Sequence, residues 1–126
     1  CTRVDHTGID LIARNPSTKE LMGISVKSRS RNPGTETTPI SIHDTDIQKA
    51  ITASKSFGCN AYFAIVADIK DKIIIFILSA EKLRKMFSNS RETYAWKMAE
   101  KYLERYYSDP EIKIVEFKTR THSWWK

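Results

Sequence analysis

A chain of 126 residues with 40% hydrophobic and 29% charged side chains can bury the core of one domain, which argues against a disordered tail or a membrane-spanning protein. The 21 Lys and Arg residues exceed the 15 Asp and Glu residues, and the net charge of +6 favours a polyanionic partner such as nucleic acid. Only two cysteines are present, so no disulfide framework is indicated and a cytoplasmic location is expected.

The first quarter of the chain predicts a β-hairpin. Residues 9–13 are apolar apart from Asp10, turn-forming residues follow at 15–18, and a strand pattern resumes at 21–27. Successive side chains of a strand point to opposite faces. We therefore expect Asp10 and Lys27 to meet on one face of the hairpin, the face that lies away from the core.

A short strand and a helix are expected next. After a loop, a third strand is predicted at residues 37–42. From Asp46 onward, apolar and small residues recur at helical spacing. Asp44 or Thr45 is the expected capping residue, and Gly58 is expected to end the helix.

The remaining chain predicts two buried strands, a second helical region and a final strand. Continuous apolar runs at residues 61–66 and 72–78 are expected to lie centrally in a sheet. Ser79 is the expected cap of the next helix, and residues 112–117 are expected to form the last strand. Large side chains at successive four-residue steps predict the core-facing side of a helix: Tyr94, Met98, Tyr102 and Tyr106.

This order of elements predicts an α/β fold with a mixed central β-sheet flanked by helices, in a single domain that covers residues 1–126. The hairpin resembles the PD-(D/E)xK, or restriction endonuclease-like, nuclease superfamily, in which an Asp on one strand is followed by an acid-x-Lys sequence on the next. Residues 8–13 (GIDLIA) and 23–27 (GISVK) carry this resemblance. Ser25 stands where the superfamily pattern has Asp or Glu, so the chain resembles a Ser-x-Lys variant.

The resemblance implies a metal-dependent endonuclease that hydrolyses phosphodiester bonds in DNA, of a restriction, repair or junction-cleaving type, with Mg²⁺ or Mn²⁺ as its cofactor. Asp10 and the backbone carbonyl of Val26 would hold the cation. Lys27 would lie beside the attacking water and stabilise the developing negative charge. Ser25 completes the implied catalytic set, although a hydroxyl is a weak substitute for an anionic ligand.

A carboxylate from elsewhere in the chain could replace the acid that is missing at position 25. Some restriction enzymes with a Ser-x-Lys sequence recruit this carboxylate from the following helix, which makes Asp44 and Asp46 candidate metal ligands. Glu36, in the loop before that helix, and Glu20 are further candidates.

Candidate contacts to nucleic acid are basic and polar residues near the same hairpin and helix. Arg29 and Arg31 continue the every-second-position spacing that begins at Lys27, as expected for side chains that bind phosphates. Gln48 and Lys49 differ in angular position on the predicted helix, so at most one of them is expected to face the site.

Two further interpretations stay open. Without the acid at position 25, the domain could be a catalytically inactive nuclease-fold module that binds nucleic acid or mediates assembly, with Trp124 and Trp125 as anchors for a protein partner. Many superfamily members carry a Glu on a helix before the first strand, and nine residues precede Asp10 here. A further ligand could therefore lie on a segment missing from this chain. A homodimer is also compatible with the resemblance.

Overall fold

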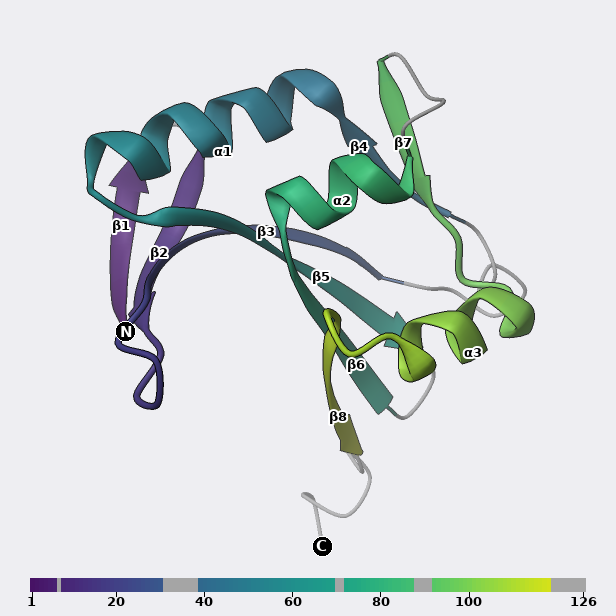
Figure 1. Ribbon diagram of the computed structural model, residues 1–126. Coiled ribbons are helices and arrows are strands. Elements are labelled where there is room, and N and C mark those ends of the chain that lie inside the picture. The colour runs from purple at the N-terminus through teal and green to yellow at the C-terminus, as the bar shows by residue number, and fades with distance from the viewer. Residues whose placement is uncertain (7, 31–38, 70–71, 88–91, 119–126) are drawn as a thin grey trace, which may run out of the picture.

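The computed structural model of the protein describes residues 1–6, 8–30, 39–69, 72–87 and 92–118. The helices in these ranges are α1 (Asp44–Ser56), α2 (Ala80–Met86) and α3 (Glu100–Ser108). The strands are β1 (Thr2–His6), β2 (Ile9–Arg14), β3 (Leu21–Ser30), β4 (Ile40–His43), β5 (Asn60–Ile69), β6 (Lys72–Ser79), β7 (Thr93–Trp96) and β8 (Lys113–Lys118) (Figure 1). No helix within these ranges is long and apolar enough to cross a lipid bilayer.

Six of the strands form one mixed sheet in the order β1-β2-β3-β5-β6-β8. β3 and β5 run parallel, and the other neighbouring pairs are antiparallel. A parallel pair needs a crossover connection, and α1 lies in the connection between β3 and β5. β4 and β7 pair in a separate two-stranded antiparallel sheet. The expected α/β fold with a mixed central sheet flanked by helices is therefore confirmed.

The main buried cluster lies between the sheet and its helices. Phe63, Ile65 and Phe76 are fully buried, and the strand register places all three on the same face of the sheet. α1 and α2 cover this face (Figure 1). Trp96 of β7 stacks on Tyr106 of α3 with 4.1 Å between ring centroids, and the ring of Phe76 lies 5.3 Å from that of Trp96. These aromatic contacts attach the C-terminal elements to the sheet.

Most of the predicted elements are confirmed. β2 and β3 form the antiparallel hairpin, and β5 and β6 occupy interior positions in the sheet. The Ser79 side chain caps α2 by accepting a hydrogen bond of 3.0 Å from the backbone N–H of Lys82. Gly58 follows the end of α1 with φ +69°, a conformation that favours glycine. β4 matches the end of the expected third strand but lies outside the central sheet, and residues 37–38 lie outside the described ranges.

The cap expected for α1 is wrong. The helix already includes Asp44, and its N-cap residue is His43, whose side chain makes no capping hydrogen bond. Neither Asp44 nor Thr45 is therefore the cap. The carboxylate of Asp44 instead accepts hydrogen bonds from side chains of α2 and β7.

The helix face expected to run from position 94 to position 106 is also wrong, because this stretch contains a strand, a loop and then α3. Tyr94, Trp96 and Met98 are buried, whereas the residues between them are more exposed. That alternation has the period of a strand. A four-residue step fits a period of 2 as well as a period near 3.6, so the spacing of the large side chains did not distinguish them. β1 is an additional edge strand that the sequence pattern did not indicate.

Candidate active site

The strands β2 and β3 stop pairing at the open end of their hairpin, away from the turn and next to a small cavity. Their backbone pairs run from Arg14↔Leu21 to Leu11↔Ile24. Just beyond the last pair, Oδ2 of Asp10 accepts a hydrogen bond of 2.8 Å from the backbone N–H of Val26. The cavity, of about 250 Å³, lies among β2, β3 and α1 and is lined by Gly8, Ile9, Asp10, Ser25, Val26, Lys27, Asp46 and Lys49.

Two glycines allow α1 to lie close to the strands at this point. A Cβ atom on Gly23 would be 2.3 Å from Oγ of Ser54, and a Cβ atom on Gly8 would be 2.4 Å from the carbonyl oxygen of Lys49. Real Cβ atoms do not approach other atoms so closely, and Gly8 also has φ +104°, which disfavours any side chain. Small residues at positions 50 and 54 of α1 complete the close packing. The helix therefore holds its first turn beside β3.

The close approach of α1 brings an acid to Lys27. Nζ of Lys27 lies 3.1 Å from Oδ2 of Asp46, and both side chains are about 30% exposed (29% and 30%). The pair is thus partly shielded but remains open to solvent. Asp10, Lys27 and Asp46 come from three different elements, and the cavity is where these elements meet.

The face on which Asp10 and Lys27 lie was expected to point away from the core, and this expectation is wrong. Gly23, two positions before the buried Ser25, packs against Ser54 of α1, and Lys27 contacts Asp46 of the same helix. The site therefore lies on the helix-covered face, at its rim. Alternation groups residues by face but does not say which face a helix will cover, because β3 also carries the buried Ile24 on its other side.

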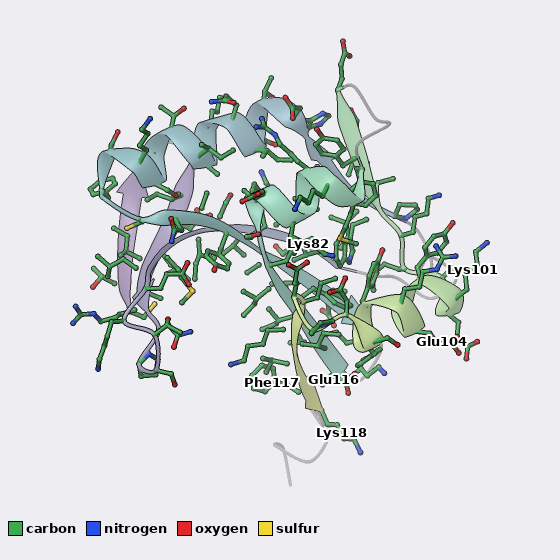
Figure 2. All side chains as sticks on the ribbon, viewed as in Figure 1. Lys82, Lys101, Glu104, Glu116, Phe117 and Lys118 are labelled. Atoms are coloured by element: carbon green, nitrogen blue, oxygen red, sulfur yellow. The ribbon has the colours of Figure 1, made fainter. Side chains whose placement is uncertain are left out.

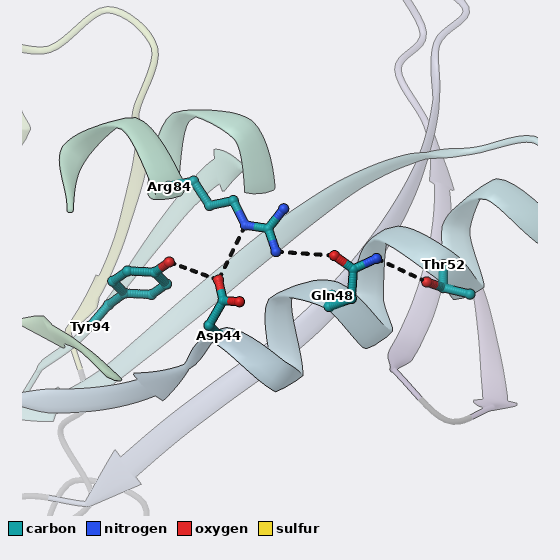
Figure 3. Close-up of polar contacts among 5 residues, drawn as sticks. All are labelled: Asp44, Gln48, Thr52, Arg84 and Tyr94. Atoms are coloured by element: carbon teal, nitrogen blue, oxygen red, sulfur yellow. Dashed lines mark hydrogen bonds and ion pairs between the residues drawn. The ribbon is translucent and has the colours of Figure 1, made fainter. Parts of the chain in front are cut away.

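Asp44 is not brought to the cavity. Its Oδ1 accepts a hydrogen bond of 2.7 Å from the Tyr94 hydroxyl and another of 3.3 Å from Nε of Arg84 (Figure 3). The hydrogen bond to Asp44 raises the pKa of Tyr94 above its ordinary value, and burial acts in the same direction. Of the two acids in the first turn of α1, only Asp46 lines the cavity, so this geometry does not support the metal-binding role expected for Asp44.

Gln48 and Lys49 also lie on different sides of α1. Oε1 of Gln48 accepts a hydrogen bond of 3.2 Å from Nη2 of Arg84, and Nε2 of Gln48 donates to Oγ1 of Thr52 at 3.3 Å (Figure 3). Gln48 therefore lies on the side of α1 that faces α2, together with Asp44. Lys49 lines the cavity. Helical spacing predicted that at most one of the two residues faces the site, and that residue is Lys49.

The other candidates lie elsewhere or outside the described residues. Glu20 binds Asn60 and Tyr62, with Oε2 of Glu20 accepting from Nδ2 of Asn60 at 2.7 Å, so it is not at the cavity. The side chain of Arg29 and all of Arg31 fall outside the described part of the chain. The same holds for residue 36 and for the two C-terminal tryptophans.

The donor set of the cavity is suited to a hard divalent cation. Asp10 and Asp46 each use Oδ2 in the contacts described above, and together they offer carboxylate oxygens from two sides. Mg²⁺ binds through one or two carboxylates and retains several waters, which matches such a site. Within the described ranges, no group of three or more His, Cys, Asp or Glu residues is placed to hold a metal ion, so the acidic ligands offered at the cavity are the two carboxylates of Asp10 and Asp46.

A hairpin, a crossover helix and a parallel partner strand lie within a mixed sheet, which is the α/β arrangement expected from the resemblance to restriction endonuclease-like proteins. The structure is similar to that of Archaeoglobus fulgidus Hjc, a Holliday junction resolvase from an archaeal hyperthermophile, with a TM-score of 0.54. The two chains are 17% identical, and the match covers 82% of this chain and 79% of the other. No protein-family model and no curated protein sequence matches the chain.

Proposed function

We propose that the protein is a metal-dependent endonuclease that cleaves DNA at branched structures such as four-way junctions. The observation that carries this proposal is the meeting of Asp10, Lys27 and Asp46 in one cavity, on a fold shared with a Holliday junction resolvase. Resolving a four-way junction requires two strand cuts and one copy offers one such cavity, so two copies would act together.

Each residue has a distinct role in this proposal. Asp10, Asp46 and the Val26 carbonyl would hold Mg²⁺, which when bound polarises the scissile phosphate and lowers the pKa of a coordinated water. The hydrogen bond from the Val26 N–H fixes the Asp10 carboxylate relative to β3. Lys27, oriented by Asp46, would donate a hydrogen bond to the attacking water or to the phosphate oxygen on which charge develops.

The hydroxyl at position 25 is compatible with this arrangement. Ser25 is only 6% exposed, so a carboxylate at that position would be largely buried. Asp46 already supplies a second negative charge to the cavity. We infer that the ligand function has moved from strand β3 to helix α1, and that a neutral side chain at position 25 avoids burying a third charge.

The experiment that tests the proposal is cleavage of a four-way junction and of a matched linear duplex with Mg²⁺, with Mn²⁺ and with EDTA. We expect metal-dependent cleavage of the junction, and a rate at least about a hundredfold lower for Asp10→Asn and for Asp46→Asn. Asp44→Asn is the matched control because it makes the same chemical change in the same helical turn, outside the cavity. It should leave the single-turnover rate within about threefold of the original, provided that thermal unfolding shows it folded.

The alternative is a catalytically inactive nuclease-fold module, and the observation that favours it is Ser25 in place of an acid. This alternative predicts junction binding that weakens steeply with salt but no cleavage with either metal. Such a result would refute the enzymatic proposal. Cleavage that is undiminished in Asp10→Asn would show instead that the cavity is not the active site.

A further inference from the structure

A second charged feature lies at the start of α3, where one cation just before the helix and two on it lie over one aromatic ring. Nζ of Lys97, Nζ of Lys101 and Cζ of Arg105 lie 4.9, 5.1 and 5.4 Å from the centroid of the Tyr102 ring. Nζ of Lys97 also donates a hydrogen bond of 3.2 Å to the Tyr102 hydroxyl. This hydrogen bond lowers the pKa of Tyr102, and the neighbouring positive charges act in the same direction. We call these four residues the α3 basic patch.

The cations of the α3 basic patch have no acidic partner among the described residues. The ion pairs there involve Lys27, Lys82 and Arg84, and none involves Lys97, Lys101 or Arg105. Lys101 and Glu104, both labelled on α3 in Figure 2, line one open hollow together with Arg105 and Asp109, but no ion pair joins either acid to Lys101 or Arg105. Three like charges at close range repel one another, and a bound anion would relieve that repulsion.

The patch borders a hollow with a mixed polar and apolar lining. The hollow has a volume of about 470 Å³ and is lined by Met86, Phe87, Lys97, Tyr102, Arg105, Tyr106 and Asp109. Asp109, the one acid in this lining, is bound to Nζ of Lys82 at 2.9 Å. The hollow thus combines cations with aromatic and thioether side chains, and it shares no lining residue with the cavity that contains Asp10.

We propose that the α3 basic patch is a second nucleic-acid contact, in which Lys97, Lys101 and Arg105 turn from the Tyr102 ring to backbone phosphates and an unpaired base takes their place against that ring. Proteins that bind single strands combine cations for the backbone with aromatic side chains for the bases, and this patch has both. The choice of nucleic acid over other polyanions rests on the proposed function. An acidic peptide without aromatic residues would use the cations but would place no planar group against the Tyr102 ring.

The test is binding of a fluorescent single-stranded oligonucleotide, and of a four-way junction, measured by anisotropy at several salt concentrations. Lys101→Gln/Arg105→Gln should weaken single-strand binding about tenfold near 0.1 M salt, and the slope of log affinity against log salt should fall by about 1.4, or 0.7 per lost phosphate contact. Tyr102→Leu should weaken single-strand binding about fivefold with little change in the slope, because stacking releases no counterions.

The matched control is Lys19→Gln/Lys55→Gln, which removes the same charge from exposed positions in the β2–β3 turn and at the end of α1. It should change binding by less than about threefold. An equal loss in both double variants would mean that only net charge matters and would overturn the inference. So would an unchanged affinity and slope in folded Lys101→Gln/Arg105→Gln, or a polyglutamate peptide that binds as tightly as the oligonucleotide.

Cleavage separates this inference from the proposed function. Asp10→Asn should lose cleavage and keep the single-strand affinity of the original protein, because the patch lies outside the cavity. If the original protein does not cleave DNA but the double variant loses single-strand binding, the inference about the patch is supported and the enzymatic proposal is refuted. If the original protein cleaves DNA and the double variant binds single strands normally, the enzymatic proposal is supported and the inference about the patch is refuted.

Discussion

The cavity beside α1 and the basic patch on α3 both use lysines, but they treat their charges differently. In the cavity, Lys27 is paired with Asp46, and Asp10 is held by a backbone N–H. On α3, the three cations around Tyr102 have no acidic partner among the described residues. Balanced charges suit a site that must stabilise charge as it develops during a reaction, whereas unbalanced cations suit a site that only holds an anion.

The two regions also differ in how the chain builds them. The cavity combines β2, β3 and α1, and depends on two glycines that bring the helix close. The α3 basic patch is local, since Lys97 lies just before α3 and Lys101 and Arg105 lie one turn apart on it. Mutations that move α1 should therefore affect the cavity and spare the patch.

The largest effect that would sharpen this comparison is expected at Lys27. Lys27→Met should lower the single-turnover cleavage rate at least about a hundredfold, or about 3 kcal/mol in activation free energy, because the ammonium acts where charge develops. Lys49→Met is a matched change in the same cavity, and we expect it to weaken junction binding several-fold with a much smaller effect on the rate at saturating protein. Equal loss of rate in both variants would contradict a specific role for Lys27.

A smaller effect is expected from the contact that positions α1. Gly23→Ala would place a Cβ atom 2.3 Å from Oγ of Ser54 and should lower the free energy of unfolding by about 1–3 kcal/mol. It should also slow cleavage while leaving single-strand binding by the α3 basic patch unchanged. Urea unfolding measures the stability, and an unfolding midpoint equal to the original would contradict the close packing.

Ser54→Ala provides the control for this prediction. Oγ of Ser54 is buried without a hydrogen-bond partner, so its removal alone should leave stability unchanged or raise it by up to about 1 kcal/mol. In the Ser54→Ala background, Gly23→Ala should lower the free energy of unfolding by less than it does in the original protein. The rescue should be partial, because Cβ of Ser54 would still lie 3.0 Å from the new atom.

The sequence pattern predicted the elements of the N-terminal half well and the site only in part. The hairpin that carries Asp10 and Lys27 follows from alternation and turn residues, and α1 follows from its periodicity. The choice between Asp44 and Asp46 did not follow, because helical spacing separates the two acids by angle without showing which one faces β3. That orientation depends on the contact between Gly23 and Ser54, which are distant in sequence.

The C-terminal half was harder to predict for a related reason. Tyr94 and Met98 are four residues apart, which fits a helix and also fits two steps of strand alternation. Tertiary contacts decide between them, since β7 pairs with β4 and Trp96 packs between Phe76 and Tyr106. The cations of the α3 basic patch could be found from their four-residue spacing, but only once the helix is known to begin at Glu100.

The smallest expected effect concerns the ion pair that neutralises Asp109 beside the patch. Nζ of Lys82 lies 2.9 Å from Oδ2 of Asp109 and 2.9 Å from Oε2 of Glu111. The hydrogen bond from Lys82 lowers the pKa of Asp109 below its ordinary value. A carboxylate whose pKa is lowered by folding stabilises the folded state at pH values above the ordinary Asp pKa of about 3.9. That stabilisation is lost as the pH falls through the lower pKa that the carboxyl group has in the folded protein.

Asp109→Asn should therefore reduce the free energy of unfolding by about 0.5–1 kcal/mol at pH 7, and urea unfolding at decreasing pH should show this difference shrink once the pH falls below the ordinary Asp pKa. Lys82→Met tests the link to the patch, because it leaves the Asp109 carboxylate without its cation in the hollow that Arg105 also lines. A free carboxylate there would compete with phosphate for Arg105, so single-strand binding should fall about twofold at pH 7. Unchanged binding in Lys82→Met, with the pH-dependent stability loss of Asp109→Asn intact, would show that the ion pair supports the fold without shielding the patch from Asp109.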